Sequence, residues 1–147
     1  METYIHKVQY YETDRMGITH HSNYVRWMEE ARVDFLEKIG WGYDKLEEQG
    51  IVSPVIKIQC EYKKSTTFND EVSIHTDLFE YKGVRMTLEY KMILARTGEI
   101  VFWGKSEHCF LNKNGFPIRL KKEFPGFDKK LAEILKEKIG GAVNTGR

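Results

Sequence analysis

Several features that mark particular protein classes are scarce in this chain of 147 residues. It has only two cysteines. Cys60 and Cys109 lie far apart without the spacing of a metal site, so we expect two reduced thiols and a cytoplasmic location. No run of about 18 apolar residues occurs, so no transmembrane helix is expected, and the start of the chain has no apolar signal core. The net charge of +1 gives no long-range attraction to nucleic acid or anionic membranes.

Motifs of several enzyme classes are absent as well. The chain has no glycine-rich phosphate loop, no nucleotide-binding fingerprint and no Gly-x-Ser-x-Gly motif. It also has no internal repeat and no inner domain boundary, and at this length one domain can bury its own core. We therefore predict a single domain over residues 1–147. Residues 140–147 have little to bury and are predicted to form a flexible tail.

The spacing of the apolar residues predicts an α+β fold. Residues 24–39 repeat apolar side chains at steps of three and four, which is the pattern of an amphipathic helix, and Gly40 is a natural stop for it. Shorter helices are predicted over Tyr43–Gln49 and residues 124–138. A period of two predicts strands, which we place at residues 3–11, 56–63, 72–78, 84–94 and 100–111. One long helix and one antiparallel sheet can bury each other's apolar faces.

The candidate chemistry is concentrated in residues 11–24, between the first predicted strand and the long helix. This segment carries Asp14, Gly17 and two histidines, followed by the good N-cap residues Ser22 and Asn23. A helix N-terminus presents unpaired N–H groups and a partial positive charge. These donors can polarise a carbonyl and stabilise the negative charge that develops when it is attacked. A carboxylate, a tight loop and a helix N-terminus are together parts of an acyl-transfer site.

The same segment resembles the active-site segment of hotdog-fold acyl-CoA thioesterases. The resemblance is carried by the pattern Asp14-x-x-Gly17-Ile18-Thr19-x-His21-x-x-Tyr24, followed by Trp27 and Ala31-Arg32. The most similar branch is the 4-hydroxybenzoyl-CoA thioesterase type, which includes the bacterial YbgC-type enzymes. Looser similarity covers most of residues 3–120, through His108-Cys109-Phe110 and Gly115-Phe116-Pro117.

This resemblance implies a hotdog fold, in which a long antiparallel sheet wraps around a central helix. It implies an enzyme that hydrolyses an acyl-CoA thioester to a free carboxylic acid and CoA, without a cofactor. Subunits of such proteins pair their sheets, so we expect a homodimer or homotetramer. Residues 101–103 are apolar on both faces of their predicted strand, which indicates either a central place in the sheet or a subunit contact.

The resemblance also implies roles for individual residues. Asp14 is expected to act as a nucleophile that forms a mixed anhydride, or as a base for water. The backbone N–H of His21 is expected to face the thioester oxygen, and the imidazole is a second candidate for contacting that oxygen or orienting water. Gly17 is expected either to let the loop pass close to the substrate or to serve as a plain turn glycine. Tyr24 belongs to the core or lines the acyl pocket.

The phosphates of CoA require cations, and Lys63, Lys64 and Arg119 are the candidates, although basic residues often only solubilise a surface. Whether CoA or an acyl-carrier protein presents the acyl group is left open. Asp14 and the two neighbouring histidines are also considered as ligands of a metal ion. Adjacent histidines point apart in most backbones and no second carboxylate lies at ligand spacing, so we predict no metal.

Two other functions remain open from the sequence. A hotdog dehydratase would require a histidine and a carboxylate across a subunit interface, and His75 or His108 would have to serve. A non-catalytic acyl-CoA-binding protein would require no reactive carboxylate at all. Glu29 and Glu30 are also considered, because another hotdog subclass has its catalytic carboxylate on the central helix; here we expect both to lie on a solvated face.

Overall fold

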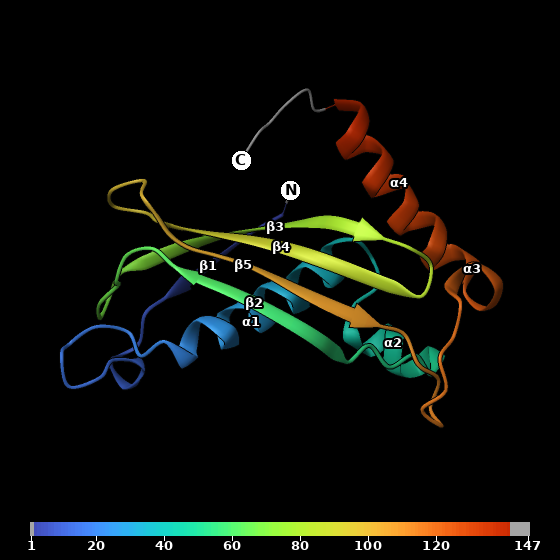
Figure 1. Ribbon diagram of the computed structural model, residues 1–147, viewed down its shortest axis with the longest axis horizontal. Coiled ribbons are helices and arrows are strands. Elements are labelled where there is room, and N and C mark those ends of the chain that lie inside the picture. The colour runs from blue at the N-terminus through green and yellow to red at the C-terminus, as the bar shows by residue number, and fades with distance from the viewer. Residues whose placement is uncertain (1, 142–147) are drawn as a thin grey trace.

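The computed structural model describes residues 2–141 of the chain. A five-stranded antiparallel sheet, in the order β1-β3-β4-β5-β2, lies across one long helix, α1 (Figure 1). The strands are β1 Glu2–Lys7, β2 Val55–Tyr62, β3 Glu71–Tyr81, β4 Arg85–Leu94 and β5 Ile100–Cys109. The helices are α1 Ser22–Lys38, α2 Tyr43–Gln49, α3 Leu120–Glu123 and α4 Pro125–Gly141, with a 3-10 turn, η1, at Tyr10–Glu12. The predicted α+β class is confirmed.

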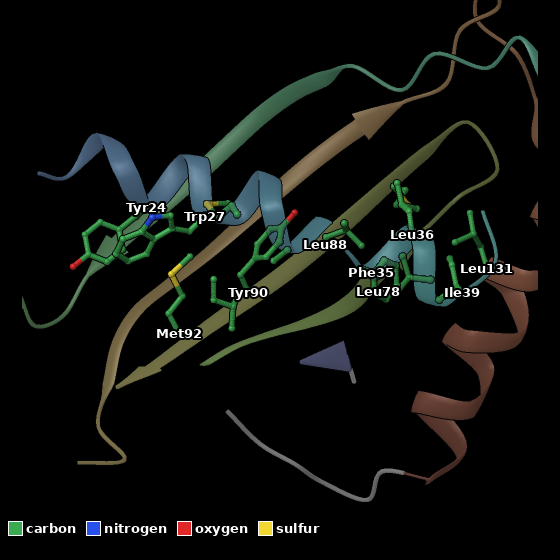
Figure 2. Packing of buried hydrophobic residues seen from close by; sticks show 14 of the residues in the cluster. Tyr24, Trp27, Phe35, Leu36, Ile39, Leu78, Leu88, Tyr90, Met92 and Leu131 are labelled. Carbon is green, nitrogen blue, oxygen red and sulfur yellow. The ribbon is translucent and has the colours of Figure 1, made fainter. Parts of the chain in front are cut away.

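Helix α1 is the centre of the core. Its buried apolar stripe faces the sheet and consists of Tyr24, Trp27, Met28, Ala31, Phe35 and Leu36. These side chains belong to one cluster with apolar residues of β3 and β4, including Leu78, Leu88, Tyr90 and Met92 (Figure 2). Full burial of one large apolar side chain stabilises a protein by about 1.5–3 kcal/mol. The stripe therefore fixes the position of α1, and of the loop that precedes it, against the sheet.

The first strand is shorter than the sequence predicted. The prediction of strand over residues 3–11 is wrong after Lys7, because the chain leaves the sheet and turns at η1. The carboxylate of Glu12 accepts a hydrogen bond of 2.8 Å from the backbone N–H of Gln9, which closes this turn. As a result Tyr10 is 75% exposed and does not continue the inward face of the strand.

Strand β5 is buried within the sheet, whereas strand β2 is exposed at its edge. Strand β5 lies between β4 and β2, and Val101 and Phe102 are fully buried, which confirms the predicted central position of this segment. Strand β2 is an edge, and its apolar residues Val55, Ile56, Ile58 and Tyr62 are between 41% and 48% exposed. An apolar edge strand is a template for pairing with another chain.

The C-terminal part covers one end of the sheet. The helix predicted over residues 124–138 is confirmed as α4, which starts at Pro125, and the short helix α3 precedes it outside the predicted range. Phe127 anchors α4 by stacking on Trp41 at 4.7 Å between ring centroids. Helix α4 includes Gly140 and Gly141 of the predicted tail, and residues 142–147 lie outside the described part. Within residues 2–141, no helix combines the length and apolarity needed to cross a membrane.

Candidate active site

A tight loop joins η1 to α1 and carries Asp14. Thr13 and Thr19 pair across the loop, and the N–H of Asp14 donates to the carbonyl of Ile18 at 2.8 Å. Gly17 lies at the turn with a φ of +79°, and no atom lies within 4 Å of the place of a Cβ. The backbone conformation, rather than lack of space, therefore requires glycine at this position.

The loop is anchored to the segment that follows β2. The N–H of Thr19 donates to the carbonyl of Thr66 at 2.8 Å, and the hydroxyl of Thr67 donates to the carbonyl of Gly17 at 2.8 Å. The hydroxyl of Tyr24 lies 3.0 Å from the hydroxyl oxygen of Thr66. Tyr24 is therefore a buried core residue whose polar end supports the loop.

Asp14 is half-buried in this loop. Its Oδ1 accepts a hydrogen bond of 2.8 Å from the N–H of Met16, the arrangement of an Asx turn. Its other oxygen, Oδ2, has no hydrogen-bond partner among the described residues. The carboxylate thus stabilises the turn with one oxygen and leaves the other available.

A cavity of about 270 Å³ lies between the loop, the start of α1 and the end of β2. Its lining residues are Ile18, Thr19, His21, Tyr24, Tyr62, Lys63, Lys64 and Ser65. The structure thus brings together four of the residues predicted from the sequence: His21, Tyr24, Lys63 and Lys64. Asp14 and Gly17 belong to the same loop but do not line this cavity in the single chain.

His21 is the N-cap of α1, one residue earlier than the predicted N-caps. That prediction is wrong because His21 already has helical backbone angles, and the side chain of Asn23 donates instead to the carbonyl of Glu12 at 3.0 Å. The backbone N–H of His21 donates to no acceptor within residues 2–141. Its imidazole is exposed and stacks on His20 at 4.4 Å between ring centroids. The site therefore offers one unpaired N–H beside the cavity.

The predicted phosphate-binding residues lie at two ends of the molecule. Lys63 and Lys64 form exposed ion pairs of 2.8 Å with Glu61 and Glu99, and the hydrogen bond with Glu99 raises the pKa of Lys64. Surface pairs of this kind contribute little to stability, so either lysine can exchange its partner for a phosphate. Arg119 precedes α3, at the end opposite the start of α1 (Figure 1).

Arg119 lines a separate and larger cavity of about 750 Å³ between the β3–β4 turn and the C-terminal helices. Three lysines line the same cavity: Lys82, Lys121 and Lys136. The three predicted cations therefore do not form one phosphate site within a single chain.

A third cavity, of about 270 Å³, lies beside α1 and was not anticipated from the sequence. Its wall is apolar at Val25, Met28, Val55 and Ile58, and polar at Arg26, Glu29, Tyr90 and Ser106. Strand residues of this kind become neighbours of a helix only through the tertiary fold, so no local sequence signal marks them.

Glu29 is exposed, as predicted, but it is paired with Arg32, whereas Glu30 is half-buried, contrary to the prediction. Arg32 is 3% exposed and donates from Nε and Nη2 to the two oxygens of Glu29, at 3.0 and 2.7 Å. The hydrogen bond with Arg32 outweighs burial and lowers the pKa of Glu29. Glu30 accepts a hydrogen bond of 2.8 Å from the hydroxyl of Tyr4. The spacing of three residues between Glu29 and Arg32 is the sequence signal for this pair.

The residues considered for other functions lie elsewhere. His75 and His108 do not line the cavity beside the loop, and His108 is fully buried. Cys60 and Cys109 are free thiols. Within the part of the chain that the structure describes, no group of three or more His, Cys, Asp and Glu side chains is arranged to hold a metal ion.

Comparisons with known proteins identify the family to which this arrangement belongs. The sequence pattern of the thioesterase-like superfamily matches residues 8–136. This chain belongs to the thioesterase-like superfamily. The predicted hotdog fold and the predicted enzyme class, a thioester hydrolase, are therefore confirmed at the level of the family.

Individual relatives of this thioesterase-family protein agree with that assignment. "Putative acyl-CoA thioesterase YneP" of Bacillus subtilis is 36% identical over 120 residues, which cover 81% of this chain and 86% of that protein. Acyl-CoA thioesterase YbgC of Haemophilus influenzae is 26% identical over 88 residues, 59% of this chain and 65% of that protein. A solved structure of DHNA-CoA thioesterase from Staphylococcus aureus has a TM-score of 0.90 and 31% identity, covering 97% of this chain and 95% of that one.

Proposed function

We propose that this protein hydrolyses acyl-CoA thioesters, with Asp14 as the reacting carboxylate and the N–H of His21 as the donor to the oxyanion. The observation that carries the proposal is that one short loop has an available carboxylate oxygen near its start, on Asp14, and an unpaired N–H just after its end, at the start of α1. An N–H in that position favours negative charge because it also carries the positive end of the helix dipole.

Two chemical routes fit this arrangement. In the first, Asp14 attacks the thioester carbon, the carbon–sulfur bond breaks, CoA leaves as a thiolate that takes a proton from solvent, and water then hydrolyses the mixed anhydride to the free acid and restores Asp14. In the second, Asp14 removes a proton from water, the water oxygen attacks the same carbon, the carbon–sulfur bond breaks, and the departing CoA thiolate takes up the proton. In both routes the carbonyl oxygen gains negative charge opposite the N–H of His21. The imidazole of His21 is the second candidate for orienting the water.

We propose a homodimer that forms through β2. The support is the exposed apolar edge, Val55 to Tyr62, which a second copy would cover by antiparallel pairing. Strand β2 starts at the end of the molecule that holds α3 and finishes beside the start of α1 (Figure 1). Antiparallel pairing would therefore bring the Arg119 end of one copy toward the Lys63 end of the other. CoA phosphates could then meet both groups of cations.

The cavity beside α1 is the candidate site for the acyl group. Its wall is mostly apolar with a few polar groups, which is the usual composition of a small-molecule pocket. We propose that it admits a short chain or a compact ring. A hydrolysis panel that includes DHNA-CoA, named for the S. aureus relative, straight-chain acyl-CoAs and the same acyl groups on acyl-carrier protein would define the substrate. The free thiols of both cysteines support a cytoplasmic location.

The substitution Asp14→Asn tests the proposed function. Asparagine can accept the hydrogen bond from Met16 and keep the turn, but it can neither attack the thioester nor take a proton from water. We expect the release of CoA thiol to fall by about 10²-fold or more, with an unchanged circular dichroism spectrum. Asp44→Asn, at an exposed position in α2, is the matched control.

Near wild-type turnover of Asp14→Asn would remove Asp14 from the mechanism. The two rival functions give different results in the same assay. Appearance of enoyl absorbance without thiol release, from a hydroxyacyl-CoA, would indicate a dehydratase. Saturable binding of acyl-CoA without turnover on any member of the panel would indicate a binding protein.

A further inference from the structure

Glu12 is a buried carboxylate that joins three parts of the molecule. It is 5% exposed. Its Oε1 accepts hydrogen bonds of 2.8 Å from the N–H of Gln9 and from Nε2 of His6, and its Oε2 accepts one of 2.9 Å from the indole N–H of Trp27. These donors come from the N-cap residue of η1, from β1 and from the second turn of α1, so one side chain connects the strand, the turn and the helix.

The backbone of Glu12 holds the other end of the Asp14 loop. Its carbonyl accepts a hydrogen bond of 2.8 Å from the N–H of His20 and one of 3.0 Å from Nδ2 of Asn23. Residue 12 lies just before the loop and His20 just after it. Glu12 therefore holds both ends of the loop, including His20, the residue before the His21 amide.

The charge of Glu12 is maintained in its buried position. Burial by itself raises the pKa of this carboxyl, but the hydrogen bonds from Gln9, Trp27 and His6 outweigh it and lower the pKa below its usual value. A buried carboxylate is tolerated only when such donors replace water. The group is thus an ionised acceptor with at least three donors, which a neutral side chain of the same size cannot reproduce.

The network continues from His6 to Glu30 on the far side. Nδ1 of His6 lies 2.9 Å from Oε1 of Glu30, which also accepts the hydroxyl of Tyr4 at 2.8 Å. Glu30 contacts the same histidine as Glu12, but its partners Tyr4 and His6 both lie in β1, whereas the side chain of Glu12 also holds Gln9 and Trp27 and so fixes residue 12, whose carbonyl anchors the loop. It therefore serves as an internal comparison, because its loss should weaken the same network without freeing the loop.

We propose that Glu12 is a positioning residue that fixes the distance and orientation between the Asp14 carboxylate and the His21 amide. The inference deepens the proposed function and rests on it. Asp14 and His21 lie near opposite ends of a short loop whose two ends are both bonded to Glu12. Displacement of catalytic groups by about 1 Å can reduce a rate by about 10²-fold. Loss of this connection should therefore lower the rate of the chemical step more than it lowers substrate binding.

The test compares Glu12→Gln with Glu30→Gln. The side-chain amide introduced by Glu12→Gln has a single acceptor oxygen, so it must lose the bond from Trp27 or the bonds from Gln9 and His6. We expect Glu12→Gln to lower kcat by about 10-fold to 10²-fold with KM within about twofold. Both variants should lower the melting temperature to a similar extent. Glu30→Gln, however, should leave kcat within about twofold of wild type. Equal losses of kcat in the two variants would show a merely structural role and overturn the proposal.

Two further readouts separate this inference from the proposed function. In the double variant Glu12→Gln/Asp14→Asn, kcat should be no lower than in Asp14→Asn alone, because the effect of Glu12 acts through Asp14. A fully multiplicative loss would overturn the inference. Hydrogen exchange requires no substrate: the amides of Asp14, Gly17 and His20 should exchange faster in Glu12→Gln and not in Glu30→Gln. Unchanged exchange would overturn the inference, whereas an inactive wild-type protein would overturn only the proposed function.

Discussion

The fully buried imidazole of His108 makes the stability of this protein depend on pH in a defined way. His108 lies in β5, and its Nε2 is 2.7 Å from the hydroxyl of Ser106, which in turn lies 2.8 Å from the hydroxyl of Tyr90. Burial, followed by the positive charge of Arg32, lowers the pKa of His108 from 6.5 to about 4. The folded protein therefore keeps this histidine neutral at pH values where the unfolded chain protonates it.

The sign and size of the effect follow from these two pKa values. Above about pH 7 neither state binds the proton, and the contribution of His108 to stability is fully present. As the pH falls below 6.5 only the unfolded state gains the proton, and the free energy of unfolding decreases until the pH reaches the folded pKa of about 4. The loss is about 2 kcal/mol between pH 7.5 and pH 5, and about 3 kcal/mol by pH 4.

Urea unfolding at pH 7.5 and pH 5, at one protein concentration, measures this loss. Other groups also titrate in this range, so the quantity to compare is the pH-dependent loss in wild type minus that in His108→Gln. Glutamine can keep a hydrogen bond to Ser106 but cannot titrate. We expect the wild type to lose about 2 kcal/mol more than His108→Gln. The control His75→Gln should lose as much as the wild type, and an equal loss in all three proteins would refute the reasoning.

Two further predictions concern the edge strand and the cations. Ile58→Lys should convert the proposed dimer into a monomer, as measured by size-exclusion chromatography with light scattering, because it adds a charge to the apolar edge of β2. Val33→Lys on α1 should not do so, and a persistent Ile58→Lys dimer would contradict pairing through β2. Lys64→Glu and Arg119→Glu should each raise KM for acyl-CoA by about fivefold or more with kcat unchanged, because a charge reversal repels a CoA phosphate. Lys129→Glu on α4 is the control, and an unchanged KM would exclude the substituted cation from CoA binding.

Local sequence signals were sufficient for most of the secondary structure. The predicted range of α2, Tyr43–Gln49, is that of the structure, and Gly40, predicted to stop the long helix, follows the end of α1 with a positive φ. These features depend on neighbouring residues and on backbone freedom, which the sequence displays directly. The end of β1 was mispredicted because the alternating pattern continues through Tyr10. The strand ends earlier because the backbone N–H of Gln9 donates a hydrogen bond to the side chain of Glu12.

The sequence by itself determined the fold class and the segment that carries Asp14, Gly17 and His21, because helix periodicity, strand alternation and a compact motif are all local. Only the tertiary structure decided which distant residues meet that segment. The end of β2 forms the wall of the cavity, Arg119 lies at the opposite end, and Glu12 is bonded to His6 and Trp27. Such contacts depend on strand order and on how α1 packs across the sheet, and no local pattern encodes either.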